Sequence, residues 1–332
     1  MKKLSYLLLG LAGLTMASCS QEEVSNPAAN NGKGFSVEVS LPGDYATRAL
    51  SDGFTATELT VVVYDSSTQN YVTTVTAQFP ANSLTTTVNF ELAYNKSYTM
   101  FYFAQSKTSQ DQGVYTVNGA AGSVDVNYSK MTSPDNIADA YDCFYLLQNT
   151  PTITPTTPVG KATLYRFVAQ INWGTNDMLK DAISNNDAFG VDGQYVRTNF
   201  SGQAYSKWNI LEQAVDDKSL VNVSFRDWSA PAKTEAFPVV SETTTYQYVA
   251  MQYLLVKKDK SVFNYSLDIN NGGNPNANVV VDNYTMTVSE VPAQQNFRTN
   301  IYGSLLTCDY EVNVEKWPNY WTPDYDVTYP QQ

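Results

Sequence analysis

Short runs in which apolar and polar residues alternate recur along this chain, and they constrain its fold more strongly than any other feature. The first run is FSVEVSL, residues 35–41, and it ends at Pro42 and Gly43. Its apolar members are Phe35, Val37, Val39 and Leu41. A period of two residues places these four side chains on one face of a β-strand and the polar side chains on the other. The run therefore predicts a strand with one buried face.

Similar runs follow at the spacing of consecutive strands. In the first half they are LTVVVYD at 59–65, YVTTVTAQF at 71–79, LTTTVNFELA at 84–93 and SYTMFYFAQS at 97–106. Short polar segments such as SSTQN and YNK separate them and are typical of hairpin loops. In the second half TTYQYVAMQYLLVKK, VFNYSLDI and NYTMTVSEVP have the same character. Many short strands joined by turn signals predict an all-β protein built as a β-sandwich.

The length of 332 residues suits two such domains, and 43% hydrophobic residues are enough for a core. The segment NTPTITPTTPVG, residues 149–160, is rich in proline, which is excluded from the centre of a sheet. It is interpreted as a linker or as an edge strand leading to one. The predicted domains are residues 35–158 and 159–332. The stretch PDNIADAYDCFYLL, residues 134–147, is predicted to be helical or irregular.

The N-terminus has the composition of an export signal. Lys2 and Lys3 precede an apolar segment, residues 4–16, which is too short to span a bilayer permanently. The small residues Ala17 and Ser18 then lead into Cys19, which favours a bacterial lipoprotein signal, residues 1–18, over a plain signal peptide. Cleavage would expose Cys19 for acylation, and several acyl chains on one residue anchor a protein firmly. The polar residues 19–34 are predicted to form a flexible tether.

Composition excludes several function classes. The net charge of −12 disfavours binding of nucleic acid through a basic patch. The chain contains no histidine, which removes the Ser-His-Asp triad, Cys-His pairs and most zinc chemistry. The loop that begins at Asp268 resembles a calcium loop, but its twelfth position is Val279 where a bidentate glutamate is needed. We expect no enzymatic activity, no metal and no cofactor.

Two cysteines remain after Cys19, and the sequence leaves two interpretations of them open. Cys143 and Cys308 could pair, because disulfides form outside the cytoplasm. They could equally be two small buried residues.

Several motifs in their order resemble the fimbrillin-like proteins of Bacteroidales, which include major and minor fimbrial subunits. The motifs are the cysteine signal, FSVEVSL, YATRALSDG at 45–53, LYRFVAQINWGTND at 164–177 and VPAQQNFRTNIYGSLLT at 291–307. The resemblance covers essentially the whole chain. It implies two transthyretin-like β-sandwich domains in tandem after a lipoprotein signal peptide and tether. It also implies that an arginine-specific protease cuts between Arg48 and Ala49.

Such a cut would remove the strand at 35–41. A sandwich that loses a strand exposes unpaired backbone groups and apolar positions, so it accepts a strand from a neighbour. The C-terminus offers two candidate donors with the required alternation. One is Tyr325, Val327 and Tyr329, and the other is Tyr310, Val312 and Val314. Head-to-tail donation does not close on itself and builds a filament.

The expected function is a structural subunit of a cell-surface fimbria that supports adhesion. Its partners would be other copies of itself or other fimbrial subunits, and the outer membrane would hold the lipidated precursor. Two alternatives remain open. The chain could be an anchor or tip subunit of the fimbria, or a monomeric surface lipoprotein that binds a glycan or a host protein.

Overall fold

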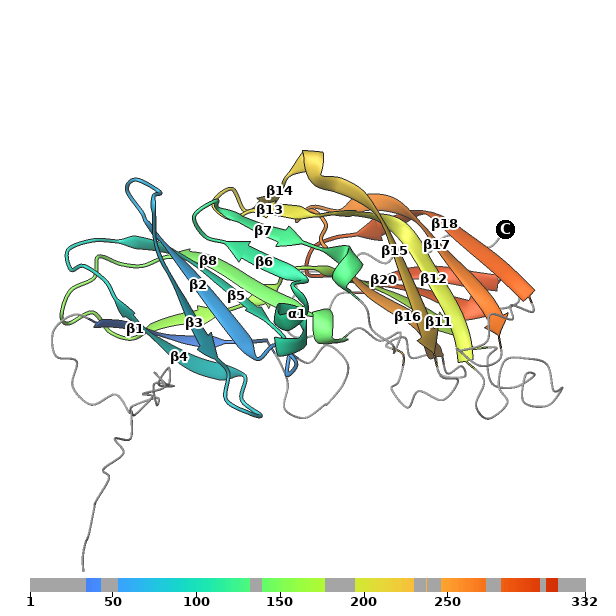
Figure 1. Ribbon diagram of the computed structural model, residues 1–332, viewed down its shortest axis with the longest axis horizontal. Coiled ribbons are helices and arrows are strands. Elements are labelled where there is room, and N and C mark those ends of the chain that lie inside the picture. Colours follow the sequence, from blue (N-terminus) through green and yellow to red (C-terminus); the bar gives the residue numbers. More distant parts are fainter. Residues whose placement is uncertain are drawn as a thin grey trace, which may run out of the picture. The chain divides into compact units, whose positions relative to one another are not determined.

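The computed structural model describes residues 34–42, 53–131, 139–176, 195–229, 237, 246–272, 282–304 and 309–315 (Figure 1). The strands of the first half are β1 (Gly34–Ser40), β2 (Glu58–Asp65), β3 (Tyr71–Gln78), β4 (Thr85–Glu91), β5 (Tyr98–Gln105), β6 (Tyr115–Asn118), β7 (Ser123–Val126), β8 (Cys143–Asn149), β9 (Gly160–Thr163) and β10 (Tyr165–Arg166). The strands that follow are β11 (Ala169–Thr175), β12 (Tyr195–Tyr205), β13 (Lys207–Asn209), β14 (Ala214–Val215), β15 (Leu220–Ser229), β16 (Gln247–Leu254), β17 (Ser261–Gly272), β18 (Asp282–Ala293), β19 (Arg298–Ser304) and β20 (Asp309–Glu315).

Few of the described residues are helical. The α-helix α1 spans Lys107–Gln112, and single 3-10 turns lie at Tyr128–Lys130, Asp139–Tyr141 and Asp217–Ser219. The hydroxyl of Ser106 caps α1 by accepting a bond from the backbone N–H of Ser109, and Gly113 ends the helix in the left-handed conformation. None of the described helices combines enough length and apolar character to cross a membrane.

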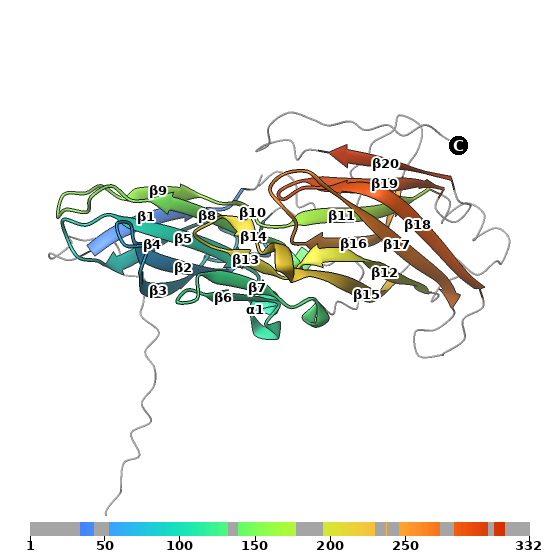
Figure 2. The same ribbon diagram turned by 90° about the horizontal axis from the view of Figure 1, so that it is seen from above.

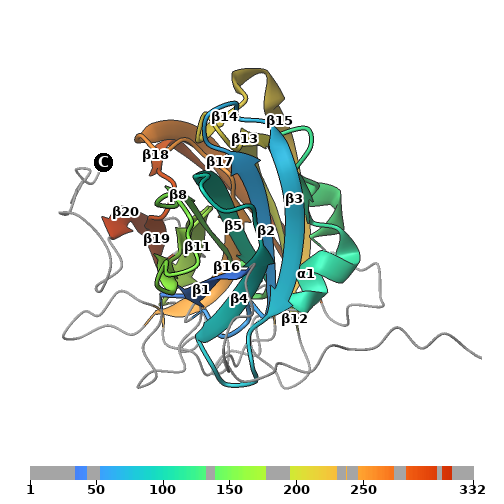
Figure 3. The same ribbon diagram turned by 90° about the vertical axis from the view of Figure 1, so that its left-hand side faces the viewer.

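Two sheets in the first half share one hydrophobic core. A three-stranded sheet has the order β4-β1-β9, and a five-stranded sheet has the order β10-β8-β5-β2-β3. Figure 3 shows β8, β5, β2 and β3 in this order, with β1 and β4 below them. Val37 of β1, Val61 of β2 and Met100 of β5 belong to this core. The opposite face of the five-stranded sheet is buried as well, because Val62 and Phe101 belong to a second core. Burial on both faces explains why LTVVVYD and TMFYF are nearly continuous apolar runs.

Two four-stranded sheets enclose most of the second core. Their orders are β16-β11-β19-β20 and β15-β12-β17-β18 (Figure 2). A further four-stranded sheet, β14-β13-β7-β6, combines strands from both halves of the chain, since Trp208 of β13 pairs with Val124 of β7. Both of these residues are fully buried in the second core. The predicted all-β sandwich fold is confirmed.

Three local predictions are wrong. The segment YNK does not connect a hairpin, because β4 pairs with β1 while β5 pairs with β2 and β8 in another sheet. Asp268 does not begin a loop, because β17 continues to Gly272. The segment 134–147 was expected to be helical or irregular, but Cys143–Asn149 forms the strand β8. This strand pairs with β5 on one side and with β10 on the other, so tertiary pairing decides its conformation. Of the rest of the segment, the structure describes only the 3-10 turn Asp139–Tyr141 and Asp142.

The division into domains at residues 158 and 159 stays a prediction. Strands that follow this boundary pair with strands that precede it: β9 lies beside β1, and β10 lies beside β8. The described residues from Gly34 onward belong to one compact unit.

Candidate functional site

The candidate functional site is the position of β1 in the middle of its sheet, which we call the β1 slot. On one side Gly34–Ser40 pairs antiparallel with Glu91–Thr85 of β4. On the other side Val37–Ser40 pairs parallel with Gly160–Thr163 of β9 (Figure 2). The slot therefore lies between two strands that are far apart in the sequence.

The apolar face of β1 fills the core below the slot. Phe35, Val37, Val39 and Leu41 expose between 0% and 5% of their surface. The intervening Glu38 is exposed, as the alternation predicts. Burying one side chain of this size stabilises a fold by about 1.5–3 kcal/mol. The predicted strand and its buried face are confirmed, whereas the removal of the strand stays a prediction.

The two ends of β1 are held differently. At the C-terminal end the N–H of Leu41 donates to the carbonyl of Leu84 at 2.8 Å, and the N–H of Leu164 donates to the carbonyl of Ser40 at 2.9 Å. The hydroxyls of Ser40 and Thr163 are also within 3.1 Å. At the N-terminal end Ser36 Oγ donates to Asn89 Oδ1 of β4 at 2.7 Å. Both neighbours therefore hold the C-terminal end, while the register with β9 begins only at Val37.

Gly160 of β9 forms part of the wall of the slot, which the sequence analysis did not recognise. A Cβ at this position would lie 3.1 Å from Cζ of Phe35 and 3.3 Å from Cγ2 of Val37. The ring of Phe35 also packs near that of Phe90, with 6.4 Å between the centroids. The absence of a side chain at Gly160 thus makes room for an aromatic ring at the first apolar position of the slot. Its place at the end of the proline-rich segment was the signal that the sequence offered.

The predicted cut site, Arg48 and Ala49, lies outside the described residues, and so does the lipidation site Cys19. The residues on either side of the cut site are close to one another. Gly53 has a φ of +86°, and a Cβ there would lie 2.8 Å from the carbonyl oxygen of Pro42. Pro42 and Gly53, the described residues that flank this part of the sequence, are therefore close to one another.

One of the two candidate donor runs is a strand within this chain. Tyr310, Val312 and Val314 lie in β20, which pairs antiparallel with β19 over Arg298–Ser304. Among the described strands it lies at the edge of its sheet, with β19 as its one neighbour. The other candidate run, Tyr325, Val327 and Tyr329, lies outside the described residues.

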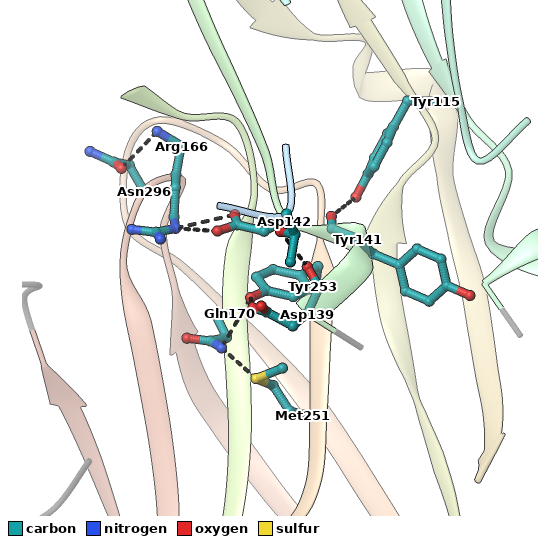
Figure 4. A network of polar contacts seen from close by, with 10 residues as sticks. Tyr115, Asp139, Tyr141, Asp142, Arg166, Gln170, Met251, Tyr253 and Asn296 are labelled. Atoms are coloured by element: carbon teal, nitrogen blue, oxygen red, sulfur yellow. Dashed lines mark hydrogen bonds and ion pairs between the residues drawn. The ribbon is translucent and has the colours of Figure 1, made fainter. Parts of the chain in front are cut away.

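A buried polar network connects segments from both halves of the chain (Figure 4). Arg166 Nε of β10 donates to Asp142 Oδ1 at 3.1 Å and to Oδ2 at 2.9 Å. The backbone N–H of Arg166 donates to Asn296 Oδ1 at 3.0 Å, and Tyr253 OH donates to Asp139 Oδ1 at 3.2 Å. Burial raises the pKa of Asp142 to about 7, although the neighbouring guanidinium of Arg166 opposes the shift. The network fastens β10 and the segment Asp139–Asp142, which leads into β8, to β16 and to the β18–β19 turn.

Cys143 lies at the start of β8 and is fully buried. Burial raises the pKa of its thiol well above the usual range, and Asp142 adds to the shift. Its possible partner Cys308 lies outside the described residues, so the disulfide stays a prediction.

A groove of about 620 Å³ lies beside β6, β7 and the start of β15. Its lining includes Asp125, Lys207 and Asn222. Some of its polar groups already have partners, since Asp125 Oδ2 accepts from Asn118 Nδ2 at 2.5 Å and Ser206 Oγ donates to the carbonyl of Ser219 at 3.0 Å. These internal bonds leave fewer groups for a ligand than the lining suggests.

No curated protein matches the sequence. The chain is similar to the solved structure of a fimbrial assembly protein from Parabacteroides distasonis, with 12% identity, a TM-score of 0.41, and coverage of 85% of this chain and 96% of that chain. It is similar to the tip fimbrial protein of Porphyromonas gingivalis, with 11% identity, a TM-score of 0.44, and coverage of 86% and 99%. It is also similar to the fimbrial anchor protein of that organism, with 8% identity, a TM-score of 0.40, and coverage of 86% and 98%.

The sequence model of one protein family matches residues 27–330 of this chain, and this range includes every strand described above. The chain belongs to a family of unknown function, DUF6562.

Proposed function

We propose that this chain is a structural subunit of a surface fimbria, and that subunits polymerise when a strand of one copy replaces β1 of the next. The observation that carries the proposal is the central position of β1. It is paired on both sides, and its apolar face is buried in the core. A strand at the edge of a sheet would leave no slot of this kind.

Cutting after Arg48 would separate β1 from every other strand that the structure describes, because β1 ends at Ser40 and β2 begins at Glu58. Loss of β1 would leave the backbone groups of β4 and β9 unpaired and would expose the core below Phe35, Val37 and Val39. Unpaired strand edges and exposed apolar surface are both costly in water. A replacement strand with the same alternation removes both costs at once.

The strand β20 has the sequence that fits the slot. Its residues DYEVNVE and the residues GFSVEVS of β1 are both seven long. Tyr310 aligns with Phe35, Val312 with Val37, and Val314 with Val39. The other candidate run, YDVTYP, places Tyr329 where the slot holds Val39 and ends at Pro330, which cannot donate a backbone bond. The pattern therefore favours β20 as the donor.

Donation from the C-terminal part of one copy to the N-terminal part of the next is a heterologous contact, which extends into a filament. In this proposal acylation at Cys19 holds the precursor at the outer membrane, and cutting after Arg48 releases it for assembly. The assembled subunits would form a fimbria on the cell surface that supports adhesion.

The proposal is tested on protein sheared from its native cells, by intact mass and by N-terminal sequencing. We expect a chain that starts at Ala49 and runs as a ladder on a gel of unboiled sample. The matched control is the variant Arg48→Gln, which should keep residues 19–48 and should run as a monomer. A natural chain that starts at a lipidated Cys19 and never forms a ladder would refute assembly. That result would favour a monomeric surface lipoprotein.

A further inference from the structure

We propose that the incoming strand first binds at the Phe35 end of the β1 slot, along the segment Pro158–Gly160, which we call the docking edge. The partner is the β20 strand of a second copy. The inference rests on the proposed strand exchange and adds the place where exchange starts.

The first argument is that the ladder between β1 and β9 does not reach this end of β1. Its pairing with β4 covers all seven residues, but its pairing with β9 covers only Val37–Ser40. Leu41 and Ser40 add backbone bonds to Leu84 and Leu164 at the other end. Opening of Val37–Ser40 breaks the ladders to both β4 and β9. Gly34–Ser36 lies outside the β9 ladder, so we expect it to open first, although Ser36 Oγ also donates to Asn89 Oδ1.

The second argument is that the docking edge is accessible and apolar. Val159 exposes 59% of its surface, which is the largest value among the exposed large hydrophobic residues of the described chain. Continuing the parallel register by one residue from Val37 and Gly160 places Val159 beside Ser36, on the outward face of the sheet. An incoming strand can therefore contact Val159 while β1 is still in its slot.

The third argument is the fit of the partner. The first apolar residue of β20 is Tyr310, and Gly160 leaves room for an aromatic ring at the first apolar position. In the same register Glu311 of the partner aligns with Ser36 and comes to lie beside Val159. A charge placed at residue 159 therefore acts directly on Glu311, because neighbouring strands bring such side chains within interaction range.

The experiment measures the rate at which a fluorescent peptide DYEVNVE replaces β1 in full-length chain that an arginine-specific protease has cut after Arg48. The rate is compared for the natural chain, Val159→Asp and Val159→Lys at low ionic strength. We expect V159D to slow exchange and V159K to accelerate it, each by about threefold. A peptide with Glu311→Lys should reverse the order of the two variants. Reversal cannot come from misfolding, since the protein is the same in both measurements.

Val262 provides the matched control. It is 57% exposed and lies in β17, outside the slot. V262D and V262K should exchange at the rate of the natural chain. The docking edge would be overturned if the exchange rate did not depend on the charge at residue 159. It would also be overturned if the altered peptide did not reverse the order of the V159D and V159K rates. Either result would leave strand exchange intact. Failure of the natural chain to exchange with any peptide would overturn the proposed function, and the docking edge with it.

Discussion

Arg166 Nε lies 3.1 Å and 2.9 Å from the two carboxylate oxygens of Asp142, and both side chains are buried. The guanidinium carbon also lies 5.1 Å from the centre of the Phe144 ring. A charge pair in such surroundings is costly to form but much more costly to break, because a lone buried charge has no solvation. The pair therefore adds to the backbone pairing that holds β10 beside β8.

Removal of one partner should destabilise the whole fold. The variant Arg166→Met leaves Asp142 buried without its guanidinium, and we expect the free energy of unfolding to fall by about 3–5 kcal/mol at pH 8. Urea unfolding of the purified chain measures the change. The double variant Asp142→Leu with Arg166→Met should regain much of the loss. As a control, Lys107→Ala removes the exposed pair with Asp111 and should change stability little. Equal losses for R166M and K107A would contradict the importance of burial.

The stability should depend on pH through Asp142. Burial raises the pKa of this carboxyl from 3.8 to about 7 in the folded chain. The folded state thus keeps a proton that the unfolded state has lost, so proton binding stabilises the fold at low pH, and this contribution disappears as the pH rises from about 4 to about 7. We expect the difference in unfolding free energy between the natural chain and Asp142→Asn to decline across that window. A difference that rises with pH would show that Arg166 outweighs burial.

Alanine substitutions at two neighbouring phenylalanines should affect the assembled fimbria differently. Phe35→Ala and Phe90→Ala should each destabilise the uncut chain by about 3–5 kcal/mol, because both rings are buried in the same core. In the proposed fimbria Phe35 has been discarded, whereas Phe90 remains in β4. The resistance of the fimbrial ladder to heat should therefore be normal for F35A and reduced for F90A. Equal weakening of both ladders would mean that β1 stays in the subunit.

A larger side chain at residue 160 should lower the stability of the uncut chain. A Cβ already lies within 3.1 Å of Phe35, so Gly160→Ala needs a small shift, while Gly160→Val adds two further methyl groups beside the same ring. Overpacking of this kind costs about 1–3 kcal/mol. We expect thermal unfolding of the uncut chain to show a larger loss for G160V than for G160A. In the fimbria the same variants should weaken the ladder, since Tyr310 of the donor would meet the same wall. A G160V chain as stable as the natural one would exclude Gly160 from the wall of the slot.

The sequence by itself determined where many strands lie and which of their faces are buried. The alternation of Phe35, Val37 and Val39 with polar residues predicted both the existence of β1 and its inward face, because the side-chain period of a strand is a local property. The doubly buried β2 and β5 were recognisable for a similar reason, since their apolar runs are nearly continuous. The match between β1 and β20 is also present in the sequence alone.

Only the tertiary structure decided which strands are neighbours. The parallel pairing of Gly160 with Val37 joins residues more than a hundred positions apart, and nothing local in either segment specifies it. The same holds for Trp208 beside Val124, which unites the two halves in one sheet. Residues 143–147 were misassigned because the pairing of β8 with β5 and β10 overrides local preference. The β1 slot is a product of such pairing: its wall at Gly160 becomes visible only when β9 lies beside β1.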